Sequence, residues 1–228
     1  MAQQTRIIIV PGWRDSGPGH WQTLWQEQLQ TPWPAQWQAP EAPAGAQASA
    51  WSVERVVQDD WLTPQREAWV GALERLVLAR PGPVVIVAHS LGCITTTHLG
   101  DAAASRVQGA LLVAPADPER RGVLADFAPV PYAPLPYRSI LVASNTDPFC
   151  PVRLAGAYAR AWGSEFVRLQ DAGHINVESG HGHWPLGWGL LQSLLSEVQA
   201  PQSPTAPLSA AAQAVAHGEI PPLQRAQA

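Results

Sequence analysis

Residues 84–93, VVIVAHSLGC, read as a buried strand, a sharp turn and the beginning of a helix. Four branched aliphatic residues and Ala88 form the predicted strand, and a helical pattern follows Ser90. The general pattern of a turn that presents a nucleophilic serine is G-x-S-x-G, with small residues on either side. This chain has Ala88 at the first glycine position, which keeps the small size and reduces the backbone freedom. Ser90 is therefore a candidate nucleophile at the tip of a turn, and capping of the helix is the alternative role.

Composition and charge exclude several classes of protein. The 228 residues carry a net charge of −4 and contain no run of basic residues, which argues against an electrostatic nucleic-acid binder. No stretch approaches the ~20 apolar residues of a membrane-spanning helix, and no basic segment followed by an apolar one opens the chain. We therefore expect a cytoplasmic protein with no membrane or nucleic-acid partner, in which Cys93 and Cys150 remain thiols.

Strand-like and helix-like runs alternate along the chain. The predicted strands are residues 6–10, 52–58, 84–88, 107–113, 139–143 and 165–169, and the predicted helices are residues 20–29, 64–77, 91–104, 152–162 and 184–198, with a short one near 121–127. This alternation predicts an α/β fold, a doubly wound sheet of about six mainly parallel strands with helices on both faces. The last helix is expected to bury Leu186 together with four other leucines, at positions 190, 191, 194 and 195.

Two segments differ in composition from the rest of the domain predicted for residues 1–199. Residues 31–50 form an insertion rich in Pro, Ala and Gln, which we place at the amino edge of the sheet. Residues 200–228 form a tail rich in Ala and Pro, expected to be flexible or weakly docked. Both are candidate surfaces for a protein partner or for self-association.

Candidate catalytic residues follow the predicted strands, where a parallel sheet gathers its ligand site. Ser90 follows the third strand, Asp117 the fourth, Asp147 the fifth and His174 the sixth. The order Ser, Asp, His along the chain is that of α/β-hydrolases. Asp147 is favoured over Asp117 as the acid because the usual position follows the strand before the one that bears the histidine.

The chemistry of acyl transfer explains why these residue types are needed. A serine hydroxyl is a weak nucleophile until an imidazole takes its proton, and the imidazole needs an acceptor that fixes its tautomer. His174 is the predicted base, and His89, next to Ser90, is its first competitor. The H-x-H pair at residues 181–183 with Glu178 nearby is an alternative metal site, although no further ligand stands at a convincing spacing. We expect no bound metal.

Backbone donors and aromatic residues complete the predicted site. The oxyanion hole is expected from the backbone N–H groups of Leu91 and Trp13, because one donor follows the nucleophile and the other follows the first strand. Gly12 then lets the backbone approach the substrate. Trp61, Phe149 and Trp184 are placed by sequence near the same edge, and we expect them to wall an apolar pocket rimmed by residues 115–136.

These motifs resemble those of small serine hydrolases of the YdeN and retinoblastoma-binding-protein-nine type. The resembling segments are VPGWRDSGPGHWQ (10–22), VERVVQDDW (53–61), VAHSLGC (87–93), LVAPAD (112–117), PLPYRSILVASNTDPFC (134–150) and AGHINVESGHGHWPLG (172–187). The resemblance implies a compact α/β-hydrolase without a separate cap domain, a triad of Ser90, Asp147 and His174, and hydrolysis of small esters or related acyl compounds without a cofactor. Some members of this family are discussed mainly as binding partners of other proteins, so an interaction module on a hydrolase scaffold is the alternative function.

Overall fold

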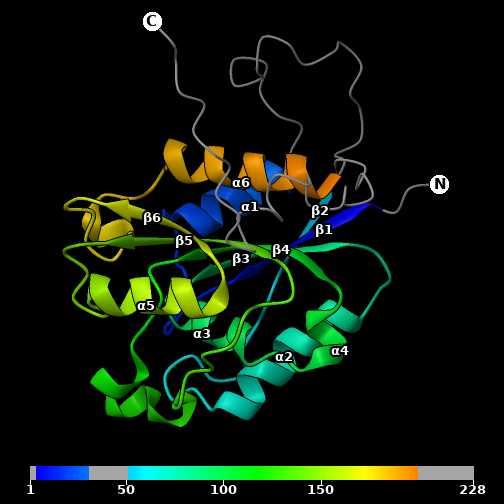
Figure 1. Cartoon of the computed structure of the whole chain (residues 1–228). Helices are drawn as coiled ribbons and strands as arrows, with labels where there is room; N and C mark the ends of the chain where they lie inside the picture. The colour runs from blue at the N-terminus through cyan, green and yellow to red at the C-terminus, as the bar shows by residue number, and fades with distance from the viewer. Residues whose placement is uncertain (1–3, 31–50, 200–228) are drawn as a thin grey trace, which may run out of the picture. The chain divides into compact units, whose positions relative to one another are not determined.

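A single parallel sheet organises the computed structural model, which describes residues 4–30 and 51–199 (Figure 1). Its six strands lie in the order β2-β1-β3-β4-β5-β6. The strands are β1 (Thr5–Val10), β2 (Trp51–Arg55), β3 (Val84–His89), β4 (Val107–Val113), β5 (Arg138–Ser144) and β6 (Glu165–Leu169). The predicted fold class is confirmed. The predicted insertion 31–50 and tail 200–228 lie outside the described residues.

The central strands β1 and β3 are buried along their whole length. They pair in parallel, with Ile8 opposite Ile86, and β3 pairs with β4 on its other side, with Ile86 opposite Ala110. Strands with neighbours on both sides and helices over both faces need apolar side chains at every position, which explains the uninterrupted branched residues of both segments. The strand that ends at the predicted turn is therefore fixed at the centre of the domain.

Helices cover both faces of the sheet (Figure 1). Helices α1 and α6 lie on one face, and α2, α3 and α5 lie on the other. The helices are α1 (Trp21–Gln30), α2 (Arg66–Leu78), α3 (Leu91–Thr97), α4 (Asp101–Ala104), α5 (Val152–Trp162) and α6 (Pro185–Gln199), and the 3₁₀ turns are η2 (Pro118–Arg120), η3 (Gly122–Phe127) and η4 (Val177–Ser179). Among the described helices, none is both long enough and apolar enough to cross a bilayer.

Each face of the sheet carries its own apolar core. Trp21 and Trp25 of α1 pack with leucines of α6 on one face, and Trp69 and Leu73 of α2 pack with Trp162 of α5 over the other. The three tryptophans Trp21, Trp25 and Trp69 are at most 2% exposed. Complete burial of one such side chain stabilises the fold by about 1.5–3 kcal/mol, so these faces anchor the helices firmly.

Two helical predictions differ from the structure. The helix expected over residues 91–104 is interrupted at residues 98–100, directly after three consecutive threonines at 95–97 that end α3 and whose hydroxyls donate to carbonyls one turn earlier. β-Branched residues that bond back to the helix weaken its continuation. Leu186 was expected on the buried side of the last helix and is 52% exposed, because residues 191, 194 and 195 define a buried face that position 186 does not share.

Candidate active site

The turn after β3 presents Ser90 in a left-handed conformation, with φ 54° and ψ −122°. The Ser90 amide donates to Val113 O at 3.0 Å, so the turn is anchored to the neighbouring strand β4. Although Ser90 occupies the capping position of α3, its side chain makes no capping hydrogen bond. Its hydroxyl instead lies 2.9 Å from His174 Nε2, the contact that a candidate nucleophile requires.

Close backbone contacts explain the glycines around this turn. A Cβ on Gly92 would contact the carbonyl oxygens of Val10 and Pro11, so α3 can pass over the end of β1 only with glycine there. A Cβ on Gly12 would lie 2.6 Å from Ser90 Cβ, closer than real Cβ contacts allow. Gly12 therefore lies directly against the serine, as expected of a residue that brings the backbone close to a substrate.

His174 and Asp147 complete a chain of hydrogen bonds that begins at Ser90. His174 Nδ1 lies 2.9 and 3.0 Å from the two carboxylate oxygens of Asp147. Because a carboxylate only accepts, Nδ1–H donates to Asp147 and Nε2 is left to accept the Ser90 proton. Both partner side chains are buried, His174 at 9% and Asp147 at 2% exposed, which shields this chain of bonds from water. The arrangement can transfer a proton from Ser90 to His174 and stabilise the resulting imidazolium.

A short polar segment holds the His174 loop against the Asp147 loop. Ser144, Asn145 and Thr146 each accept a hydrogen bond through a side-chain oxygen from the backbone amides of residues 172, 171 and 173. No role was predicted for these three residues. The sequence did contain a pattern that could have identified them, because three polar side chains directly follow a buried strand and precede the predicted acid.

The other candidate acid and base lie in different surroundings. Asp117 accepts from the Glu119 amide at the start of η2 and lies 3.6 Å from Arg120. His89 points away from Ser90, and its Nε2–H donates to the His174 carbonyl at 2.9 Å. His89 therefore supports the backbone of the candidate base and does not compete with it.

Buried groups behind the turn reinforce this support. The His20 ring lies 4.8 Å from the His89 ring, and burial lowers the pKa of both imidazoles, that of His20 to about 4. Gln22, fully buried, donates to the carbonyls of Val10 and Val87 at the ends of two central strands. Neither His20 nor Gln22 was predicted from the sequence, because neither position is distinguishable from an ordinary helix start.

Two of the four predicted pocket residues lie directly beside the candidate catalytic groups. Gly12 contacts Ser90, and the Phe149 ring lies 4.3 Å from the His174 ring while its amide donates to Asp147. Trp61 is half-buried and packs edge-on against Trp69 at 5.5 Å. Its carbonyl accepts from the Arg14 amide, so it belongs to the same edge of the sheet.

The fourth predicted pocket residue, Trp184, is wrongly placed by the sequence. It is 6% exposed, stacks on Trp25 at 6.0 Å and meets Trp21 edge-on at 5.4 Å. These contacts place it in the core between α1 and α6. The sequence located it at the start of the last helix, near the edge of the sheet, but carried no information on which way its side chain turns.

The predicted oxyanion donors come from the residue after the serine and from the loop after β1. Leu91 is the first residue of α3, where the first backbone N–H groups of a helix have no partner within it. Trp13 follows Gly12, and its indole Nε1–H donates to Leu62 O at 2.9 Å, which fixes the ring over the loop after β2. In the described part of the chain, the Trp13 backbone amide has no acceptor.

The two cysteines and the candidate metal ligands at residues 178–183 do not form a second reactive site in the described residues. Cys93 and Cys150 are free and buried, and burial raises the pKa of both thiols, that of Cys150 to about 12. Over residues 4–30 and 51–199, no three His, Cys, Asp or Glu side chains are grouped so that they could hold a metal ion. Glu178 and the histidines of residues 181–183 are therefore not brought together as a ligand set.

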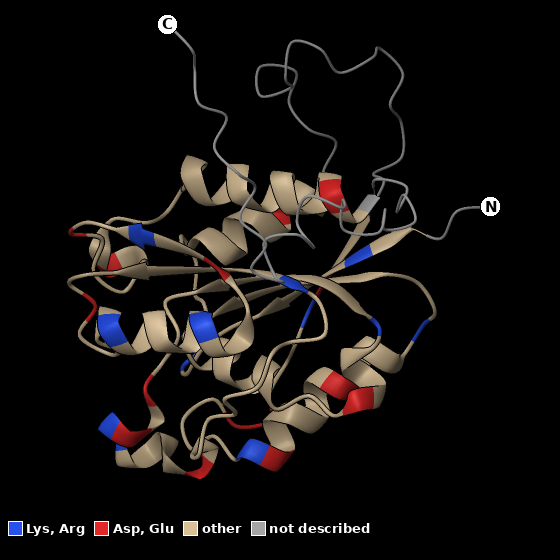
Figure 2. Ribbon diagram, viewed as in Figure 1, with Lys and Arg blue, Asp and Glu red and all other residues tan. Residues whose placement is uncertain are grey.

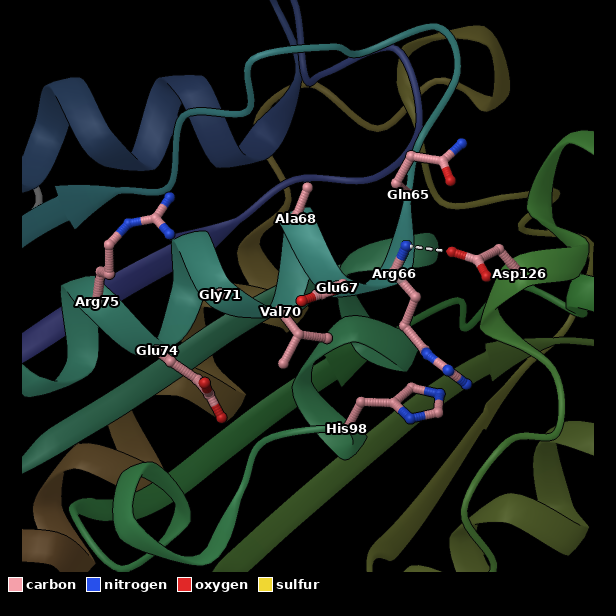
Figure 3. A pocket seen from close by; sticks show the side chains of 10 residues that line it. All are labelled: Gln65, Arg66, Glu67, Ala68, Val70, Gly71, Glu74, Arg75, His98 and Asp126. Carbon is pink, nitrogen blue, oxygen red and sulfur yellow. Dashed lines mark hydrogen bonds between the residues drawn. The ribbon is translucent and has the colours of Figure 1, made fainter.

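A surface hollow of about 920 Å³ runs along α2 and is separate from the candidate catalytic groups (Figure 3). In it, the Arg66 amide donates to Asp126, and His98 lies nearby with its Nε2–H donating to the Phe127 carbonyl. Both signs of charge line its walls, because α2 carries acidic and basic residues together (Figure 2). None of Ser90, Asp147 or His174 lines this hollow.

Comparison with protein families gives a match over nearly the whole described region. The profile of the family described as Serine hydrolase matches residues 7–51 and 36–193. No curated protein matches the chain. The expected resemblance to YdeN-like serine hydrolases is confirmed.

Solved structures give the same result. A YdeN-like hydrolase from Pectobacterium atrosepticum is 30% identical, with a TM-score of 0.70 over 86% of this chain and 93% of that chain. The ydeN gene product of Bacillus subtilis is 19% identical, with a TM-score of 0.63 over 85% of this chain and 100% of that chain. Est1E of Butyrivibrio proteoclasticus, solved with bound ferulic acid, is 11% identical, with a TM-score of 0.61 over 85% of this chain and 89% of that chain. The last two likenesses show the fold alone.

Proposed function

Because this chain belongs to the serine hydrolase family, we propose that it hydrolyses small esters or related acyl compounds through Ser90, His174 and Asp147. The observation that carries the proposal is the continuous chain of hydrogen bonds from Ser90 Oγ to His174 and on to Asp147, with each link at 2.9–3.0 Å. This geometry is the one that removes a proton from a serine as it attacks a carbonyl carbon.

The reaction would proceed in two steps. In the first, Ser90 Oγ attacks the carbonyl carbon while His174 Nε2 takes the hydroxyl proton, and the carbonyl oxygen becomes an oxyanion. His174 then gives this proton to the leaving alcohol as the bond to carbon breaks, which leaves the acyl group on Ser90. In the second step, a water attacks the acyl carbon, His174 takes a water proton and returns it to Ser90 Oγ, and the carboxylic acid departs.

The other residues would act by orientation and by charge. Asp147 holds Nδ1–H of His174, so that Nε2 faces the serine, and stabilises the imidazolium of each step. The Leu91 and Trp13 amides are proposed to donate to the oxyanion, where one such donor typically contributes about 3 kcal/mol of transition-state stabilisation. Gly12 leaves room for the substrate against Ser90.

Labelling with a fluorophosphonate probe tests the nucleophile directly. The wild-type protein should label, and Ser90→Ala should not, because only an activated serine displaces fluoride from phosphorus. Ser196→Ala, which removes an exposed hydroxyl of α6, is the matched control and should label fully. The wild-type protein and Ser196→Ala should also hydrolyse 4-nitrophenyl butyrate, and Ser90→Ala should not. Label retained in Ser90→Ala would contradict the assignment, and a folded wild-type protein that never labels would favour the interaction module.

A further inference from the structure

Two arginine side chains lie over aromatic rings at the candidate active site. The Arg14 guanidinium carbon is 4.3 Å from the centre of the Trp13 ring, and that of Arg121 is 5.6 Å from the same ring and 4.4 Å from the Phe149 ring. These are the three cation–π contacts within residues 4–30 and 51–199. We call Trp13, Arg14, Arg121 and Phe149 the rim.

The rim borders the candidate catalytic groups on two sides. Trp13 follows Gly12, which contacts Ser90, and the Phe149 ring packs on the His174 ring at 4.3 Å. Only the Phe149 ring separates Arg121 from His174. A positive charge is therefore held beside the place where the ester carbonyl must sit.

Neither rim arginine has a carboxylate partner in the part of the chain that the structure describes. The acid next to Arg14, Asp15, is already engaged by Arg55 at 2.5 Å. A guanidinium stacked on a ring keeps its N–H groups free at its edge, and stacking reduces the freedom that it loses when it binds a ligand. Both arginines thus present unused donors in a restricted orientation.

We propose that Arg121, assisted by Arg14, binds a carboxylate of the substrate, so that the preferred substrates are esters that carry a free carboxylate close to the scissile bond. This inference rests on the proposed ester hydrolysis and names its substrate class. A guanidinium matches a carboxylate with two parallel N–H···O bonds, and such charge-assisted pairs are stronger than neutral hydrogen bonds.

The carboxylate could belong to either half of the ester. Phe149 lies on His174, which would protonate the leaving alcohol, whereas Trp13 is a proposed donor to the carbonyl oxygen. Two pairs of substrates distinguish these sources. The acyl pair is the 4-nitrophenyl monoester of adipic acid and its methyl-capped diester, and the alcohol pair is 4-butyryloxybenzoate and phenyl butyrate.

The test compares Arg121→Gln with Arg120→Gln. Arg120 precedes Arg121, carries the same charge, pairs with Asp117 and makes no cation–π contact in the described residues, so it is the matched control. In at least one pair, the wild-type protein should prefer the anionic ester in kcat/KM. Arg121→Gln should lower this preference about 10-fold, and Arg121→Lys should restore part of it. Arg120→Gln should leave the preference unchanged. High salt should lower the preference of the wild-type protein as well.

Equal kcat/KM for both members of both pairs would overturn the carboxylate subsite while ester hydrolysis stands. An equal loss on anionic and neutral esters in Arg121→Gln would overturn it too, because Arg121 would then only support Phe149. A binding measurement separates this proposal from catalysis. Calorimetry on Ser90→Ala should detect monomethyl adipate and not dimethyl adipate, with the binding lost in the Arg121→Gln double variant. Binding without any fluorophosphonate labelling of the wild-type protein would retain the subsite and reject the hydrolase.

Discussion

The turn at Ser90 and the rim lie next to each other and are held by different forces. The turn is built from backbone contacts, a buried hydrogen-bond chain and glycines that admit no side chain. The rim is built from exposed arginines that rest on aromatic rings from loops far apart in the sequence. The difference indicates that the geometry at Ser90 is rigidly specified, whereas the proposed carboxylate subsite depends on side chains that single substitutions can exchange.

The largest effect is expected where the buried hydrogen-bond chain is cut. Asp147→Asn should lower kcat by about 10³–10⁴-fold, because an amide does not stabilise the imidazolium and can select the wrong tautomer of His174. The matched control is Asp117→Asn, which changes the other candidate acid and keeps an acceptor for the Glu119 amide. Steady-state ester hydrolysis measures the kcat of both variants. A larger loss in Asp117→Asn would reverse the assignment of the acid.

A methyl group placed against the serine tests how rigid the turn is. Gly12→Ala puts a Cβ 2.6 Å from Ser90 Cβ, so the serine or the loop must move, and kcat/KM should fall about 100-fold. Gly17→Ala lies in the same loop with nothing within 4 Å of the added Cβ and should retain activity. Equal activity of the two variants would show that this part of the site adapts as readily as the rim.

Lowering the pH should reduce the stability of the fold through the buried histidine behind the turn, and it should leave the charge of the rim unchanged. Burial, together with the charge of Arg55, lowers the pKa of His20 to about 4, whereas an unfolded histidine has a pKa of about 6.5. Between these values the unfolded state binds the additional proton, so stability is complete above pH ~6.5 and falls as the pH falls towards 4. His20 alone should cost about 2 kcal/mol between pH 7 and pH 5.

Urea unfolding at several pH values measures this dependence. His20→Asn keeps an acceptor for the Gln22 amide and should show a shallower decline in stability towards pH 5 than the wild-type protein. Some decline should remain, because burial also lowers the pKa of His89. An unchanged slope in His20→Asn would show that His20 is not the group that resists protonation.

The turn and its partners were predictable from the sequence, and the rim was not. Parallel strands bring their carboxyl ends to one edge, so residues that follow β3, β5 and β6 meet there whatever the details of the helices. By contrast, the stacking of Arg121 on Trp13 and Phe149 depends on the path of the irregular segment that carries η2 and η3, which no periodicity encodes. Trp184 shows the same limit, since its position at the start of the last helix was predicted and the direction of its side chain was not.

Ser90 is the position at which folding and chemistry favour different amino acids. Its left-handed φ of 54° costs a residue with a side chain about 1–3 kcal/mol, a cost that glycine escapes. Selection for thermal tolerance alone would therefore drive position 90 towards glycine and erase the hydroxyl. The hydroxyl at position 90 is therefore present at a cost in stability, which the proposed role of Ser90 as the nucleophile would explain.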